Sequence, residues 1–336
     1  MEPDAKHPGG GRFEALVDLT DLIGRRERLA VAASVFPPNR PGSPLTVMFL
    51  WPGGGYNRNY FDLAPSGRAD YSQARHHAKA GILAIALDHL GVGDSTVPNT
   101  AFGLYDLAHA NALAATTLLL RLREGRLVPS WPPVSGICAL GLGHSYGALL
   151  LVLLQARWPS FAGVGFLGWS SINTVIPYDR SSAYADLIHT RRVPAALHPY
   201  RQAFHFDDVP MDIIEQDLEG YPHRLEHSPI PSWGSVWMPG GPHARPEQPP
   251  NTNITAADAA NIDVPVLMAL GERDVSPDPW LEPSAYRSSR DITLCSFARM
   301  AHAHNFASTR HLLWDRVTAW GLGITQRVGA NKDIVS

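Results

Sequence analysis

A serine between two glycines is the feature of this 336-residue chain that points most clearly to catalysis. Ser145 is the centre of a Gly-x-Ser-x-Gly pattern over residues 143–147, between an apolar run that predicts a strand (136–143) and one that predicts a helix (146–156). A tight turn there can hold the hydroxyl away from the backbone, and glycine suits the crowded flanking positions. The helix N-terminus would stabilise negative charge that develops nearby. The pattern therefore favours a nucleophilic serine over an ordinary turn with a capping serine.

The segments around this turn alternate between expected strands and expected helices. Short apolar runs predict buried strands, and most are followed by segments with helical spacing. The expected strands cover residues 13–22, 28–37, 45–51, 82–89, 136–143, 164–170, 264–271 and 292–298. The expected helices cover residues 71–80, 101–127, 146–156 and 279–288, and a final helix follows. This order predicts an α/β fold with a mostly parallel sheet of about eight strands flanked by helices.

The alternation breaks between residues 172 and 262, where Pro, His, Tyr and Trp are frequent. We expect a core formed by residues 13–171 and 263–327, with residues 172–262 inserted as a cap or lid. Residues 1–12 and 328–336 are expected to be flexible termini.

These motifs together resemble the α/β-hydrolase family, over almost the whole chain outside the insert. Besides the serine turn, the likeness rests on WPGGGY (51–56) after the third expected strand. It also rests on DHLGVGDS (88–95) after the fourth, which matches the family's D-x-x-G-x-G-x-S turn. We expect the second segment to be structural, tied together by Asp88 and Ser95.

The resemblance implies an acid and a base for the serine. The family's triad acid follows the strand at 264–271, where Asp274 stands, with Glu272 and Asp278 as nearby alternatives. The family's histidine position falls on His302, and His304 is the alternative general base. The order serine, aspartate, histidine is that of the family. In such a triad the carboxylate orients the imidazole, which takes the serine proton.

The resemblance also implies an oxyanion hole made of backbone N–H groups. The donors would belong to Gly54 and to Tyr146, the residue after the nucleophile. This chain has Pro52 where the family has histidine, which leaves the register open by one residue, so Gly55 is the alternative donor.

Residues that could line a substrate pocket carry a weaker signal. Trp169 follows a strand on the expected active-site side, and His144 and Tyr56 adjoin the two motifs. The insert adds Trp233 and Trp237. Packing of the insert onto the core would explain its aromatic residues at least as well.

Composition excludes several classes of protein. The net charge of −3 offers no basic excess to neutralise phosphates, so no nucleic-acid partner is expected. The two cysteines lie in apolar runs, which argues against a disulfide framework or a Cys-rich zinc site. Without a P-loop, a metal-ligand spacing, a membrane-length apolar run or an N-terminal signal core, we expect no cofactor, no metal, no membrane span and a cytoplasmic location. A homodimer is compatible with the sequence.

The expected function is that of a serine hydrolase. It would cleave a carboxylic ester, lactone or thioester of a medium-sized hydrophobic small molecule through an acyl-enzyme. Acyl transfer to a second alcohol and hydrolysis of a C–C bond on the same triad are alternatives, and a non-catalytic ligand-binding receptor is a different class. A serine nucleophile argues against haloalkane dehalogenases and epoxide hydrolases, which have aspartate in this position.

Overall fold

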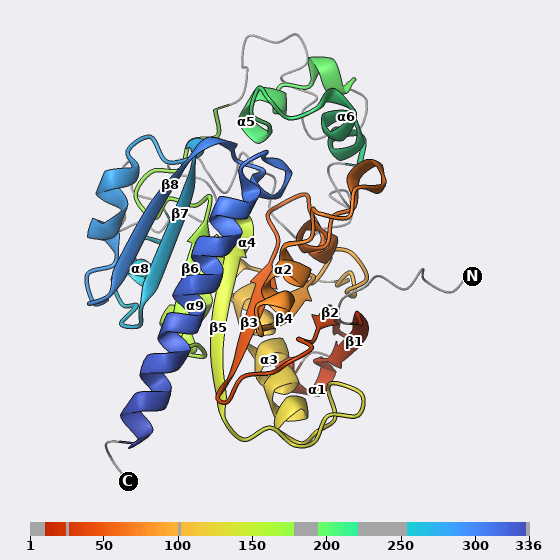
Figure 1. The fold of residues 1–336 in the computed structure, drawn as a ribbon, viewed down its shortest axis with the longest axis vertical. Coiled ribbons are helices and arrows are strands. Elements are labelled where there is room, and N and C mark those ends of the chain that lie inside the picture. The colour runs from red at the N-terminus through yellow and green to blue at the C-terminus, as the bar shows by residue number, and fades with distance from the viewer. Residues whose placement is uncertain (1–10, 25–26, 100–101, 178–193, 221–253, 334–336) are drawn as a thin grey trace.

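The apolar runs of the sequence form the strands of one eight-stranded sheet (Figure 1). The computed structural model describes residues 11–24, 27–99, 102–177, 194–220 and 254–333. The strands are β1 (Phe13–Asp18), β2 (Ala30–Phe36), β3 (Leu45–Trp51), β4 (Leu83–Leu87), β5 (Ile137–His144), β6 (Gly163–Leu167), β7 (Val266–Arg273) and β8 (Ile292–Ala301). Their order is β1-β2-β4-β3-β5-β6-β7-β8, and all neighbours are parallel except β1 with β2 and β2 with β4. The predicted α/β fold with a mostly parallel sheet is confirmed.

Helices cover both faces of this sheet. The α-helices are α1 (Thr20–Ile23), α2 (Gln73–Lys79), α3 (Leu104–Arg123), α4 (Tyr146–Arg157), α5 (Arg201–Phe204), α6 (Met211–Gly220), α8 (Ala256–Ala259) and α9 (Arg310–Asp333). Short 3₁₀ helices are η1 (Arg58–Phe61), η2 (Pro65–Gly67), η4 (Ala195–Leu197), η6 (Pro279–Ala285) and η7 (His304–Phe306). Helices α2 and α9 pack on one face, with α9 crossing the front of the sheet in Figure 1, whereas α3 and α4 pack on the other.

Strand β3 shows why the central strands are almost entirely apolar. Its one polar residue, Thr46, is buried and hydrogen-bonded to Thr325 at 2.8 Å. Its residues Leu45, Val47, Phe49 and Trp51 join the core under α3 and α4. Met48 and Leu50 point the other way and join the core under α2 and α9. Because both faces of the sheet are covered, alternation with polar residues would bury unpaired polar groups.

Two expected elements differ from the structure. The strand expected over 13–22 ends at Asp18, because its carboxylate accepts the Thr20 N–H at 2.9 Å and the short helix α1 begins there. The helix expected over 279–288 is the 3₁₀ helix η6, which contains Pro279 and Pro283. A proline inside the segment removes an N–H that an α-helix needs.

The insert between β6 and β7 places α5 and α6 beyond the carboxyl ends of the parallel strands, at the top of Figure 1. Its Trp233 and Trp237 lie outside the described residues. No helix in the described parts of the chain is long and apolar enough to cross a membrane.

Candidate active site

Ser145 occupies a sharp turn between β5 and α4. Its φ of 52° and ψ of −116° form a combination that residues with a side chain rarely adopt. The turn is held by a hydrogen bond from the Ser145 N–H to the carbonyl of Leu167 at 2.8 Å and by one from the Leu149 N–H to the carbonyl of Ser145 at 3.0 Å. Such a strained conformation persists only where the surrounding structure imposes it, and it is typical of a nucleophile position.

Both glycines of the serine turn are required by close backbone contacts. A Cβ atom on Gly143 would lie 2.4 Å from the carbonyl carbon and oxygen of Gly147. A Cβ atom on Gly147 would lie 2.4 Å from the carbonyl oxygen of Trp51. The second contact arises because β3 and β5 pair in parallel with Trp51 opposite Gly143, so the loop after β3 passes over the start of α4.

His302 joins Ser145 to Asp274. Its Nε2 lies 2.9 Å from the Ser145 Oγ, and its Nδ1 lies 2.7 Å from an oxygen of Asp274. Because a carboxylate only accepts hydrogen bonds, Nδ1 carries the proton, and Nε2 is left to accept from the hydroxyl. The three residues follow β5, β7 and β8, whose carboxyl ends meet at one edge of the sheet. The structure therefore brings together the three residues that the sequence suggested.

His304 contacts the same carboxylate from its other side. Its Nε2 lies 2.6 Å from the second oxygen of Asp274, which also accepts the Gly271 N–H at 2.9 Å. Burial acts to raise the pKa of Asp274, but the neighbouring His304 and His302 imidazoles hold it well below its usual range. The geometry therefore places His302, and not His304, against the serine hydroxyl.

The two alternative acids have other partners. Glu272 accepts the Arg299 N–H at 2.8 Å. Asp278 caps η6 by accepting the Trp280 N–H at 3.2 Å. Of the three candidate carboxylates, Asp274 is the one that contacts His302.

The glycine-rich turn after β3 lies directly against the serine. A Cβ atom on Gly53 would be 3.2 Å from the Ser145 Cβ, and Gly55 has a φ of 82°. Tyr146 is the first residue of α4, and N–H groups of a first helical turn have no partner within the helix. Gly54 lies between Gly53 and Gly55 in this turn. We therefore keep the N–H groups of Gly54 and Tyr146 as the proposed oxyanion donors.

His89 fastens the beginning of this turn. The Asn111 amide lies 3.1 Å from its Nδ1, and its Nε2 lies 3.0 Å from the carbonyl oxygen of Pro52. The amide can donate to Nδ1, which leaves the Nε2–H to donate to the carbonyl. Burial lowers the pKa of His89 to about 4, so the ring is a neutral donor at neutral pH.

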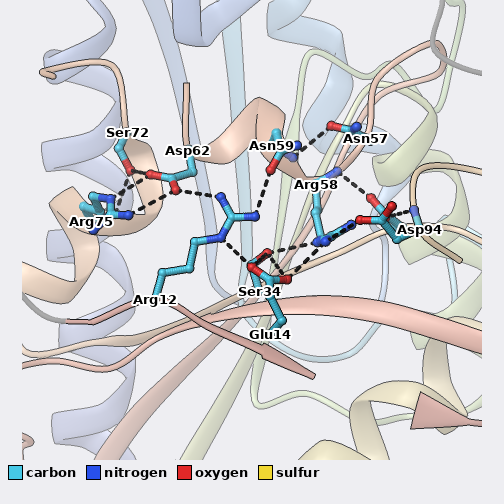
Figure 2. A network of polar contacts seen from close by, with 11 residues as sticks. Arg12, Glu14, Ser34, Asn57, Arg58, Asn59, Asp62, Ser72, Arg75 and Asp94 are labelled. Atoms are coloured by element: carbon cyan, nitrogen blue, oxygen red, sulfur yellow. Dashed lines mark hydrogen bonds and ion pairs between the residues drawn. The ribbon is translucent and has the colours of Figure 1, made fainter. Parts of the chain in front are cut away.

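Arg58 is the centre of a polar network beside the turn at 88–95 (Figure 2). Its side chain donates to Asp88, to Asp94 at 2.7 Å, to Glu14 at 3.0 Å and to Ser34 at 2.9 Å. Its backbone N–H also donates to Asp88 at 2.7 Å. Burial acts to lower the pKa of Arg58, but the surrounding carboxylates raise it. These contacts join β1, β2, η1 and the turn after β4. They agree with the structural role expected for the turn at residues 88–95.

His144 holds the backbone of the neighbouring histidine. Its Nε2–H donates to the His302 carbonyl at 2.7 Å, and its ring stacks on Tyr60 with centroids 4.7 Å apart. Burial holds the pKa of His144 well below its usual range. Helix α5 of the insert fixes the same segment, because the His302 N–H donates to the carbonyl of Ala203 at 2.9 Å.

Trp169 and Tyr56, the two other described candidates for the pocket, have different hydrogen-bond partners. Trp169 is 2% exposed, and its indole N–H donates to Ser171 at 3.2 Å and to Thr255 at 3.3 Å. Tyr56 is partly buried, and its hydroxyl donates to Asp217 of α6 at 2.9 Å. Tyr56 therefore links the loop after β3 to the insert.

Comparison with known proteins identifies the fold. No family model and no curated protein matches the sequence. The structure is similar to a probable hydrolytic enzyme from Pseudomonas aeruginosa, with a TM-score of 0.59, 15% identity and coverage of 92% of this chain and 94% of the other. It is also similar to a putative lipase from Acinetobacter baumannii (TM-score 0.61, 13% identity, 94% and 93% covered) and to a peroxisomal α/β-hydrolase from Saccharomyces cerevisiae (0.55, 12%, 95% and 91%). The chain has the α/β-hydrolase fold.

Proposed function

We propose that this protein is a serine hydrolase in which Ser145 is the nucleophile, His302 the general base and Asp274 the orienting acid. The observation that carries the proposal is the His302 ring, which is hydrogen-bonded to Ser145 on one nitrogen and to Asp274 on the other. The strained backbone of Ser145 supports it, because such strain is concentrated at functional positions.

The reaction would proceed in two halves. His302 removes the Ser145 proton while the hydroxyl oxygen attacks the substrate carbonyl, and the N–H groups of Gly54 and Tyr146 hold the resulting oxyanion. The leaving group then departs with the proton from His302, which leaves an acyl-enzyme. Water gives a proton to the same imidazole and attacks the acyl group, and His302 then returns that proton to the Ser145 oxygen as the bond to the acyl group breaks and the acid leaves. Asp274 stabilises the imidazolium in both halves.

The substrate class that we propose is a carboxylic ester, lactone or thioester of medium size. Support comes from similar structures described as a putative lipase and as a membrane phospholipase A (TM-score 0.59, 14% identity, 94% of this chain and 87% of the other covered). Another similar structure is that of an N-formylmaleamic acid deformylase, so amide-type bonds belong in the test panel.

The experiment is turnover of p-nitrophenyl acetate and butyrate, together with labelling by a fluorophosphonate probe. We expect hydrolysis and labelling at Ser145, and loss of both in Ser145→Ala with an unchanged melting temperature. Absence of turnover and labelling in the wild-type protein would contradict the proposal. Product analysis with and without an acceptor alcohol separates hydrolysis from acyl transfer.

A further inference from the structure

A pocket of about 210 Å³ is lined by the loop after β3 and by Phe306 of η7, the 3₁₀ helix that follows His302 in the chain. One side is the loop at residues 55–59 after β3, and the other includes Asp217 of helix α6 in the insert. The rings of Tyr60 and Phe306 also line it. The pocket thus lies between the core and the insert, where hydrolase-like folds bind ligands at the carboxyl ends of the strands.

Some residues that line the pocket also contact or adjoin residues around the proposed triad. Its Gly55 directly follows the proposed oxyanion donor Gly54. The ring of Tyr60 separates it from His144, on which that ring stacks. Burial raises the pKa of Tyr60, and the charges of both Asp217 and Asp274 add to the shift. One tyrosine ring therefore lies within electrostatic reach of the pocket carboxylate and the triad carboxylate.

Asp217 presents an incompletely paired carboxylate to this pocket. It is only 8% exposed, and its Oδ2 accepts hydrogen bonds from the Tyr56 hydroxyl at 2.9 Å and from the His205 Nε2–H at 2.8 Å. Among the described residues no hydrogen bond reaches its Oδ1. In the part of the chain that the structure describes, the buried His205 Nδ1 has no hydrogen-bond partner. The described partners of the Asp217 carboxylate, Tyr56 and His205, include no lysine or arginine.

The rest of the pocket suits a positive charge. No lysine or arginine is found among its described lining residues. Tyr56 and Tyr60 have ring centroids 4.9 Å apart, and the electron-rich faces of aromatic rings attract ammonium groups. A buried carboxylate is costly unless a partner compensates its charge. An apolar or anionic ligand would leave this charge uncompensated.

We propose that this pocket binds an ammonium group. The substrate of the proposed hydrolase then belongs to the esters, lactones or thioesters that carry a small cationic amine. The ammonium would contact Asp217 and the tyrosine rings, while the scissile carbonyl lies at Ser145. The assignment of a substrate class rests on the proposed function, whereas the binding of an amine does not.

The first test is calorimetric binding of benzylamine and of benzyl alcohol, which have nearly the same shape but differ in charge at neutral pH. We expect the wild-type protein to bind benzylamine at least about tenfold more tightly, since a charged hydrogen-bond pair is stronger than a neutral one. Asp217→Asn should abolish this preference. Asp212→Asn is the matched control, because Asp212 is on the same helix, is exposed and pairs with Arg68.

A second variant keeps the test decisive if Asp217→Asn does not fold. Asn59 is an exposed residue of the pocket wall whose Oδ1 accepts from Arg12 at 3.0 Å, so Asn59→Lys places a positive charge there and gives up only this exposed contact. It should weaken benzylamine binding and leave benzyl alcohol binding unchanged. Equal binding of the two ligands to the wild-type protein, or a preference that survives in a folded Asp217→Asn, would overturn the proposal.

The substrate class is tested with two p-nitrophenyl esters, one of γ-trimethylammonio-butyrate and one of its neutral analogue with carbon in place of nitrogen. We expect kcat/KM to favour the cationic ester by about tenfold through the attraction between opposite charges, since a quaternary ammonium has no N–H to donate, and this preference to disappear in Asp217→Asn. Equal kcat/KM values would overturn the substrate class. If neither ester nor any other acyl substrate is cleaved while benzylamine still binds selectively, the hydrolase proposal fails and the amine site stands.

Discussion

Two buried aspartates at the same edge of the sheet have different partners. Asp88 follows β4 and is fully buried, and Asp274 follows β7 with a side chain that is 1% exposed. Each has a histidine close to it in space or sequence, His89 for the first and His302 for the second. Asp88 is paired with the guanidinium of Arg58, whereas Asp274 is paired with two imidazoles.

The difference shows that the partner decides what a carboxylate can do. A guanidinium stays protonated at every physiological pH, so its pair with Asp88 holds the turn and moves no proton. The ring of His89 is bound on both nitrogens, to an amide and to a backbone carbonyl. His302 instead has a carboxylate on one nitrogen and a hydroxyl on the other, and an imidazole can gain and lose a proton near neutral pH.

The largest expected effect separates the two histidines of Asp274. His302→Ala should lower kcat by about 10⁶-fold, since it removes the group that accepts the serine proton. His304→Ala should lower it by only about 10- to 100-fold, because the carboxylate loses one of its supports and shifts slightly. His304→Gln, which keeps an N–H donor, should recover part of that loss. Steady-state kinetics over a range of pH measures all three, and a larger loss in His304→Ala would reverse the assigned roles.

The next effect tests the acid. Asp274→Asn should lower kcat by about 10⁴-fold, because an amide can donate to His302 Nδ1 and so favour the wrong tautomer. The melting temperature should also fall by a few degrees, because the Gly271 and Val275 N–H groups donate to different oxygens of Asp274 and the amide oxygen can keep only one of these contacts. A variant with wild-type kcat would show that Asp274 is structural, as Asp88 is.

For Asp88 and its partner Arg58, the expected effect of a substitution is on the stability of the fold. Arg58→Ala leaves Asp88 buried without a cation and should reduce the free energy of unfolding by about 3–5 kcal/mol. Urea unfolding measures this loss. The kcat of the remaining folded protein should stay within a few-fold of wild type. A large loss of kcat in stably folded Arg58→Ala would make this network part of the catalytic machinery.

The smallest expected effect concerns pH and His89. In the unfolded chain a histidine takes up a proton below about pH 6.5, whereas folded His89 stays neutral down to about pH 4. Its contribution to stability is therefore complete above pH 6.5 and is lost as the pH falls to 4, by about 3 kcal/mol in total. Unfolding free energies measured between pH 7 and 4 should show a flatter slope in His89→Gln. An unchanged slope would indicate that the folded ring titrates normally.

The sequence predicted the strands, the serine turn and the three triad candidates because each depends on a local pattern or on chain order. The runs at 45–51 and 136–143 match β3 and β5 to within a residue. Contacts between distant segments could not be predicted in this way. Examples are His304 on Asp274, the carbonyl of Ala203 on the His302 N–H, and Tyr56 on Asp217.

The assignment of His144 illustrates the same limit. Its position next to Ser145 suggested a pocket residue, but the sequence holds no information on where its ring turns. In the structure the ring packs between Tyr60 and the His302 carbonyl, and both partners come from other parts of the chain. The domain boundaries and the lid role of the insert stay predictions.

The topology of the sheet has a consequence for how activity arises during synthesis. Ser145 and His302 are 157 residues apart in the chain, and the whole insert lies between them. A nascent chain that ends before β8 already contains the serine turn but has no base to activate it. With His302 as the proposed general base, the chain would stay inert until its last strand, β8, and the histidine after it have left the ribosome. The closure of this long loop is an entropic cost that the final strand pairing must overcome.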